Sequence, residues 1–104
     1  MTDNTIVFIQ ILNSQKPEKK YVARFFNRNR DIIKQTHFGS KYSVTYNEDN
    51  DEEAKENYIA RHSGNEDWNN PTTPGALSRW LLWNRRSLSA SFKDFLKKFE
   101  LKEY

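Results

Sequence analysis

Apolar residues near the start of the chain come in short runs that polar breaks separate. The runs are rich in β-branched and aromatic residues, a composition that predicts β-strands. We expect strands over residues 5–13, 20–27 and 31–38. Pro17 marks the first break, and Gly39 stops the third strand. Because the breaks are short, the strands should pair in order as an antiparallel meander.

After the third strand, the apolar spacing changes to that of helices. Residues 40–49 indicate an ordered loop held in place by Tyr42 and Tyr46. Asp49 or Asn50 can cap the next helix, whose acidic first turn suits the positive end of the helix dipole. The first turn comprises Asp51, Glu52 and Glu53, the apolar positions are Ala54, Tyr58, Ile59 and His62, and Gly64 follows the C-cap.

Two more helices are predicted in the C-terminal third. Thr73 supplies a cap and Pro74 a first-turn proline for a helix over Gly75–Asn84, which two arginines would close. Ser87 can cap a last helix, whose apolar residues form one stripe. That stripe consists of Leu88, Phe92, Phe95, Leu96 and Phe99.

Together these elements predict an α+β fold, a three-stranded antiparallel meander followed by about three helices packed on it. We expect a single domain over residues 1–104, with the meander in residues 1–39 and the helical part in residues 40–104. Seven Phe, five Tyr and three Trp supply much apolar area for a short chain. A single aromatic-rich core is therefore expected.

The sequence contains no cysteine, which excludes disulfides and thiolate metal sites. Small secreted domains often need such cross-links, so a reducing compartment inside the cell is expected. The N-terminal apolar run lacks the basic flank and the cleavage site of a signal peptide. No stretch approaches the roughly 20 apolar residues of a membrane span. We therefore expect a protein that is neither secreted nor membrane-spanning.

Charge is distributed unevenly along the chain, although the net charge is only +3. Residues 1–46 carry eight Lys and Arg against three acids, and residues 71–104 carry seven against three. Between them, residues 47–70 carry two against eight. This order differs from the uniform positive charge of a DNA-packing protein. It predicts either separate basic and acidic patches or segments that neutralise one another in the fold.

Catalytic and metal-binding motifs are missing from the sequence. His37 and His62 are predicted on different elements, without the close spacing of metal ligands. The acidic run over residues 48–53 lacks the central glycine and the spaced glutamate of an EF-hand loop. Neither a phosphate-binding glycine loop nor a nucleophile elbow occurs. We predict no catalytic residue, no metal, no cofactor and no enzymatic activity.

A segment rich in Trp and Arg, between residues 58 and 86, is the most specific local feature. Trp and Arg are typical anchors of protein interfaces. The same residues can instead form a second core cluster that fixes the loop between two helices. We favour that structural role for Trp68 and Trp80. The residues expected to bind a partner protein are Arg79, Trp83, Arg85 and Arg86.

Nucleic-acid binding is the alternative, because basic residues alternate with aromatic rings in two places. Lys and Arg pair with phosphates, and rings stack on bases. In the second strand, however, alternation puts Arg24 and Phe25 on opposite faces, so rings turned inward and charges turned outward explain much of the pattern. The alternative site comprises Lys20, Arg24, Arg28, Arg30, Lys93 and Lys97.

A series of short motifs covers most of the chain, over residues 16–99. They are Arg24-Phe25-Phe26, His37-Phe38-Gly39, Tyr58-Ile59-Ala60-Arg61-His62, Trp68-Asn69 and the run from Pro71 to Asn84. In this order they resemble a small-protein family of giant nucleocytoplasmic large DNA viruses. The family is uncharacterised, so the resemblance implies a viral origin and no mechanism. The acids at residues 51–53 differ from the basic helix of that family, which disfavours nucleic-acid binding there.

Such viruses assemble their capsids from a major protein and many small minor ones, so the resemblance implies a virion-associated role. We expect a small non-enzymatic structural or interaction protein, a minor capsid or assembly component that binds other virion proteins. Its sheet would serve as a platform or would pair through an exposed edge strand. The alternative is a nucleic-acid-binding accessory protein. Either would reside in the virion or in the host-cell cytoplasm, at the virus factory.

Overall fold

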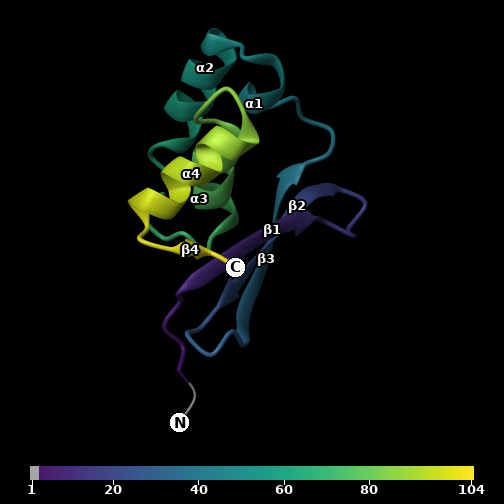
Figure 1. Cartoon of the computed structure of the whole chain (residues 1–104). Coiled ribbons are helices and arrows are strands. Elements are labelled where there is room, and N and C mark those ends of the chain that lie inside the picture. Colours follow the sequence, from purple (N-terminus) through teal and green to yellow (C-terminus); the bar gives the residue numbers. More distant parts are fainter. Residues whose placement is uncertain (1–2) are drawn as a thin grey trace.

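The computed structural model describes residues 3–104, so the first two residues of the predicted domain lie outside the described part. It confirms the α+β fold, with three strands first and helices after them. Figure 1 shows the helices gathered over one end of the sheet, while the turn around residues 27–31 extends beyond them. The shape is elongated, with extents of 47 × 28 × 25 Å.

The first three strands form the predicted antiparallel meander. They are β1 (Phe8–Asn13), β2 (Lys19–Phe26) and β3 (Ile32–Ser40), in the order β3-β2-β1. The prediction that the third strand stops at Gly39 is wrong. Gly39 adopts a left-handed φ of 80°, and β3 continues through it to Ser40. A Cβ at this position would lie only 2.9 Å from Leu82 Cδ1. Glycine therefore lets β3 pass beneath the helices where a larger residue would be strained.

A fourth strand, β4 (Lys102–Glu103), corrects the predicted three-stranded sheet. It pairs with β1 in parallel, and Tyr104 N donates to Ile9 O at 3.0 Å. The Tyr104 ring then stacks on Phe26, with 3.8 Å between ring centroids. Two charged residues carry no strand signal of their own, so their conformation is decided by this tertiary pairing.

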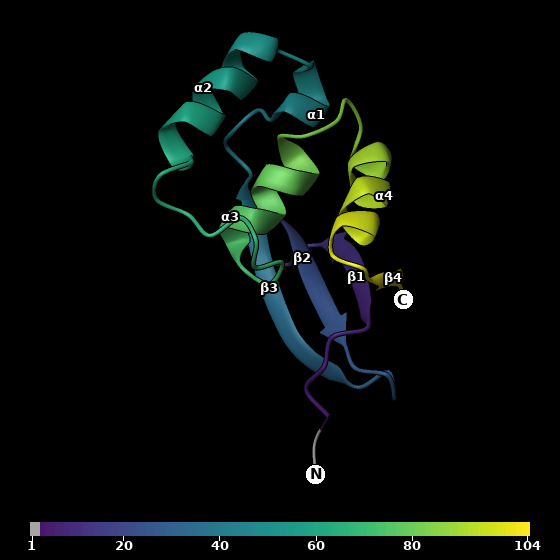
Figure 2. The same cartoon turned by 90° about the vertical axis from the view of Figure 1, so that its left-hand side faces the viewer.

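The core lies between one face of the sheet and the helices. Alternation along β2 turns Ala23 and Phe25 toward the helices, whereas Arg24 and Phe26 point to the opposite face. Figure 2 shows that the helices lie on one side of the sheet only. The buried core consists of Ile9, Ala23, Phe25, Phe38, Leu77, Leu81, Leu82 and Phe95.

The segment after β3 differs from the prediction. Part of the expected loop is a short helix, α1 (Tyr46–Asp49), which ends at Asn50 in a left-handed conformation with φ of 56°. Asn50 therefore does not start the next helix. Asp51 takes that role, and its side chain accepts a hydrogen bond from Ala54 N at 3.1 Å. As a result, α2 (Glu52–His62) begins one residue later than predicted.

The next predicted helix begins as expected but changes its winding. Thr73 caps α3 (Pro74–Leu77) through its side-chain oxygen. The chain continues as a π-helical turn, η1 (Ser78–Leu82), in which Trp83 N donates to Ser78 O at 3.1 Å. The helical part ends two residues earlier than predicted, so the two arginines that follow do not close a helix.

The last helix, α4 (Leu88–Lys98), confirms the predicted apolar stripe and cap. Ser87 Oγ accepts a hydrogen bond from Ala90 N at 3.2 Å. Phe95 is fully buried against the sheet and η1. Across residues 3–104, no helix has both the length and the apolar character needed to cross a bilayer.

Candidate protein-binding site

The loop between β3 and α1, residues 41–45, carries the two most exposed large apolar side chains of the described residues. Tyr42 is 83% exposed and Val44 is 63% exposed. The prediction that Tyr42 pins this loop is wrong, because its ring lies in solvent. Tyr46 is buried as expected of a pinning residue. Large side chains on a surface loop are the kind of feature that serves as an interface anchor.

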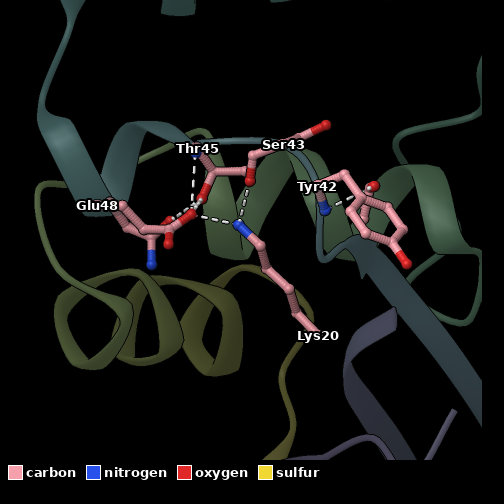
Figure 3. Close-up of polar contacts among 7 residues, drawn as sticks. Lys20, Tyr42, Ser43, Thr45 and Glu48 are labelled. Carbon is pink, nitrogen blue, oxygen red and sulfur yellow. Dashed lines mark hydrogen bonds and ion pairs between the residues drawn. The ribbon is translucent and has the colours of Figure 1, made fainter. Parts of the chain in front are cut away.

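A polar network centred on Lys20 holds the β3–α1 loop in place, as Figure 3 shows. Lys20 Nζ donates to Ser43 O at 2.6 Å and also contacts the carboxylate of Glu48. Glu48 accepts a second bond, from Thr45 N at 3.0 Å, at the start of α1. In Figure 3 the Tyr42 ring points away from Glu48. The backbone is thus fixed from the inside while the exposed side chains face outward.

The charge of Glu48 is stabilised by this network. The hydrogen bond from Lys20 is the main cause that lowers the pKa of the Glu48 carboxyl, and bonds from Thr45 act in the same direction against partial burial. With the folded-state pKa below the unfolded one, the stabilising contribution is present above the usual glutamate pKa. It is lost as the pH falls through the lowered folded-state value.

Glu48→Gln is expected to lower the free energy of unfolding by about 1 kcal/mol at neutral pH, because the capping and ion-pair bonds weaken. The difference from wild type should shrink as the pH falls below the usual glutamate pKa of about 4.3, and it should vanish once the pH is below the lowered folded-state pKa. Urea unfolding at neutral and acidic pH measures both effects. Glu56→Gln, at an exposed position on α2, is the matched control. A difference that does not depend on pH would contradict this role of Glu48.

Trp83, a predicted partner-binding residue, is half-buried and joins α2 to η1. Its ring stacks on Tyr58, with centroids 4.5 Å apart and planes 5° from parallel. Tyr58 in turn packs on His62 at 4.4 Å. Burial, with help from the nearby Glu66 charge, raises the pKa of Tyr58 to about 12, so the phenol stays neutral. Trp83 therefore has a packing role, and its binding to a partner protein stays a prediction.

Arg79, the second predicted partner-binding residue, is also half-buried. Its Nη1 donates to Trp83 O at 2.7 Å, just after the π-helical turn. The guanidinium lies 4.3 Å from the centroid of Trp80 and 5.4 Å from that of Trp68, within reach of cation–π attraction. Burial lowers the pKa of Arg79 below its usual value. These contacts hold the Arg79 side chain against the fold instead of leaving it free in solvent.

Trp68 and Trp80, which were expected to have a structural role, fix the loop between α2 and α3. Trp80 Nε1 donates to Trp68 O at 2.8 Å, and Trp68 Nε1 donates to Glu66 Oε2 at 2.8 Å. The other oxygen of Glu66 lies 3.1 Å from His62 Nδ1. Both indole N–H groups thus have partners within the protein. Both rings are half-buried, and these bonds agree with the structural role expected of them.

The remaining predicted partner-binding residues, Arg85 and Arg86, are exposed and lie in the connection to α4. Arg85 pairs with Asp94, and this pairing lowers the pKa of the Asp94 carboxyl. Asn50 donates from its side chain to Arg86 O at 3.1 Å. The four predicted residues are therefore neighbours in sequence with different surroundings, two half-buried and two exposed. Their binding role stays a prediction.

The basic residues of the alternative site are spread over both sides of the sheet. Arg24 lies on the face without helices and donates to Gln35 at 3.2 Å. Lys93 and Lys97 are exposed on α4, which covers the other face. The other three residues all have partners. Lys20 is bound in the β3–α1 network, Arg28 pairs with Asp3, and Arg30 lies over Phe8. These six residues do not make one continuous basic surface.

The two histidines also lie apart. His37 Nδ1 is 2.7 Å from Ser14 Oγ on the face of the sheet without helices, whereas His62 belongs to the aromatic cluster. Across residues 3–104, no three His, Asp or Glu side chains converge as metal ligands do.

Sequence reasoning did not single out Val44 as a candidate for binding. The sequence gives little sign that Val44 is exposed. Tyr42 and Val44 alternate with Ser43 and Thr45, a pattern that is equally typical of an edge strand with one face buried. The contacts of Lys20 with Ser43 and Glu48, which lie 23 and 28 positions away, hold the segment in its path after β3, and Tyr42 and Val44 are exposed there.

A family model matches residues 9–62, which is 54 of the 104 residues. The matched part contains β2, β3, the β3–α1 loop and α2, together with most of β1. No curated protein and no solved structure matches the chain significantly. The chain therefore belongs to the family of unknown function DUF5754.

Proposed function

We propose that this protein is a small non-enzymatic structural or interaction protein that binds another protein through the β3–α1 loop. The observation that carries the proposal is the exposure of Tyr42 and Val44 on a loop fixed by Lys20 and Glu48. Exposed aromatic residues contribute strongly to binding when a partner buries them. A loop that is already fixed loses little conformational entropy on binding, so more of that contact energy is retained.

The resemblance of the motifs to a giant-virus family supports a more specific proposal. The partner would be a capsid or other virion protein, and this protein a minor capsid or assembly component. It would reside in the virion or at the virus factory in the host cytoplasm. Mass spectrometry of purified virions tests this part. Its presence in infected cells together with absence from virions would contradict it.

Nucleic-acid binding is the second candidate, supported by the exposed arginines of the turn between β2 and β3. Arg28 and Arg30 lie at the end of the sheet that the helices leave uncovered. Phosphate contacts would make such binding weaken steeply as salt increases. A gel-shift titration of DNA and RNA at low salt tests whether the protein binds nucleic acid. If neither nucleic acid shifts, this candidate is excluded.

Tyr42→Ala is expected to weaken binding to the partner protein by about tenfold or more, as is typical of an interface anchor. Val44→Ala should weaken it less, because a smaller side chain is removed. The measurement is quantitative mass spectrometry of proteins that co-purify with each tagged variant from infected cells. Ile32→Ala is the matched control, since Ile32 is a large exposed apolar residue elsewhere on the sheet.

The Tyr42→Ala variant should fold as the wild type does. Substitution of a side chain as exposed as Tyr42 changes the free energy of unfolding by about 0.5 kcal/mol at most. Thermal unfolding curves of the variants should therefore overlay that of the wild type. Equal recovery of the partner with Tyr42→Ala and wild type would refute the proposed role of the loop.

A further inference from the structure

One edge of the sheet is only partly covered. β4 pairs with Phe8 and Ile9, whereas β1 continues to Asn13. On this side the carbonyl of Ile9 accepts from β4. Alternate residues of a strand turn their backbone groups to the same edge, so Ile11 and Asn13 also point outward here. Within residues 3–104, no strand pairs with these two residues on that side.

A groove of about 690 Å³ lies beside this free edge. Ile11 and Tyr21 form its sheet wall, and Leu88 and Phe92 of α4 form its helix wall. Figure 2 shows α4 above β1 and β4, which places the helix wall along the edge. Among the described residues that line the groove, Glu103 alone has a charged side chain. The groove thus combines apolar walls with a row of free backbone donors and acceptors.

We propose that the free edge of β1 binds an extended segment of a partner protein as an added strand, in line with β4. Backbone N–H and C=O groups that alternate along an edge are matched by the backbone of another extended chain. Side chains of that strand alternate between its two faces, so every second one enters the groove between the sheet and α4. The bound segment therefore has apolar residues at alternate positions and a basic residue next to Glu103.

The opposite edge of the sheet, on β3, is less suited to this role. Its pairing with β2 is shifted between Phe25 and Phe26, and its other end contains the left-handed Gly39. Lys34 lies between them, and an edge lysine disfavours strand addition. On the β1 edge, β4 already shows that a parallel strand can pair there.

This inference rests on the proposed protein-binding role but uses a surface that shares no residue with the β3–α1 loop. The test begins with a library of random eight-residue peptides displayed on phage and selected against the whole protein. Enriched peptides should show apolar residues at alternate positions and a basic residue. Their binding should shift the backbone amide signals of residues 10–13 in NMR spectra of the labelled protein. Failure to enrich any such sequence overturns the proposal.

A backbone variant gives the sharper comparison. Asn13→Pro removes an outward N–H, whereas the pairing of β1 with β2 is retained through neighbours such as Ser14, whose N donates to Lys20 O at 3.0 Å. Asn13→Ala keeps the N–H and is the matched control. Asn13→Pro should weaken binding of an enriched peptide by about tenfold, and Asn13→Ala by no more than about twofold. Equal binding by both variants overturns the proposal.

A second measurement covers the case in which Asn13→Pro disturbs the fold. N-methylation of the peptide at the alternate amides that face β1 should abolish binding, and methylation of the intervening amides should preserve it. Loss with both sets or with neither overturns strand addition.

Further outcomes show whether the peptide binds at a different site or whether a second copy of the chain occupies the edge. Peptide binding that Tyr42→Ala abolishes and Asn13→Pro leaves intact places the peptide on the β3–α1 loop, which overturns the edge proposal and supports the loop. Loss with Asn13→Pro alone supports the edge, whatever happens to the loop. Self-association that Asn13→Pro disrupts, measured by analytical ultracentrifugation, would show that a second copy occupies the edge and would overturn a separate partner.

Discussion

Replacing Phe25 with alanine is expected to lower the free energy of unfolding by about 3–5 kcal/mol. Phe25 is fully buried, faces Ile9 across the strand pair and belongs to the cluster that joins the sheet to Leu81 and Phe95. Truncation removes the apolar contacts of the ring and leaves a cavity that close-packed neighbours fill only in part. Domains of this size have total stabilities of about 5–15 kcal/mol, so a large fraction would be lost.

Urea unfolding followed by tryptophan fluorescence measures this change. Ile32→Ala is the comparison, because Ile32 lies in the neighbouring strand but is about half exposed. It should cost about 1 kcal/mol or less. Similar losses for the two variants would mean that the face of the sheet under the helices is not the core.

Trp83→Ala is expected to cost about 2–3 kcal/mol, somewhat below the value for a fully buried aromatic residue. The substitution removes the stack between Tyr58 of α2 and Trp83, the residue that ends η1. Hydrogen exchange should therefore accelerate in α2 more than in the sheet. Urea unfolding and exchange measured on the same samples test both parts.

Tyr42→Ala provides the control for an exposed aromatic residue. If Trp83→Ala changes stability as little as Tyr42→Ala does, then Trp83 does not have a packing role. The initial prediction of a partner-binding surface at Trp83 would then be favoured again. Loss of stability without loss of partner binding would assign the Trp-rich segment to the core.

Local patterns in the sequence predict the elements that local physics determines. The three meander strands follow from their β-branched and aromatic residues, and the starts of α3 and α4 follow from the side-chain caps of Thr73 and Ser87. β4 has no such pattern, because its two charged residues become a strand only through pairing with β1. The short helix α1 was not predicted. It ends at Asn50 in a left-handed conformation, whereas the sequence suggested Asn50 as a cap at the start of the next helix.

The candidate site depends on contacts between residues that are distant in sequence. Tyr42 and Tyr46 look equivalent as apolar residues in a polar segment, yet one is exposed and the other buried. The difference arises because Lys20 on β2 binds Ser43 and Glu48 and thereby sets the path of the loop. No periodicity in residues 40–49 carries that information. The basic residues of the alternative site likewise come from two segments of the sequence, and the fold places them on both faces of the sheet.

The proposed function requires that the β3–α1 loop contacts a partner protein. The direct measurement is site-specific photo-crosslinking with protein that carries a photoreactive phenylalanine analogue in place of Tyr42, incubated with extract of infected cells. Mass spectrometry then identifies the cross-linked protein. We expect one dominant virion protein from position 42 and no such product when the probe replaces Ile32. No cross-link at position 42, or the same products from both positions, would contradict a binding role of the loop.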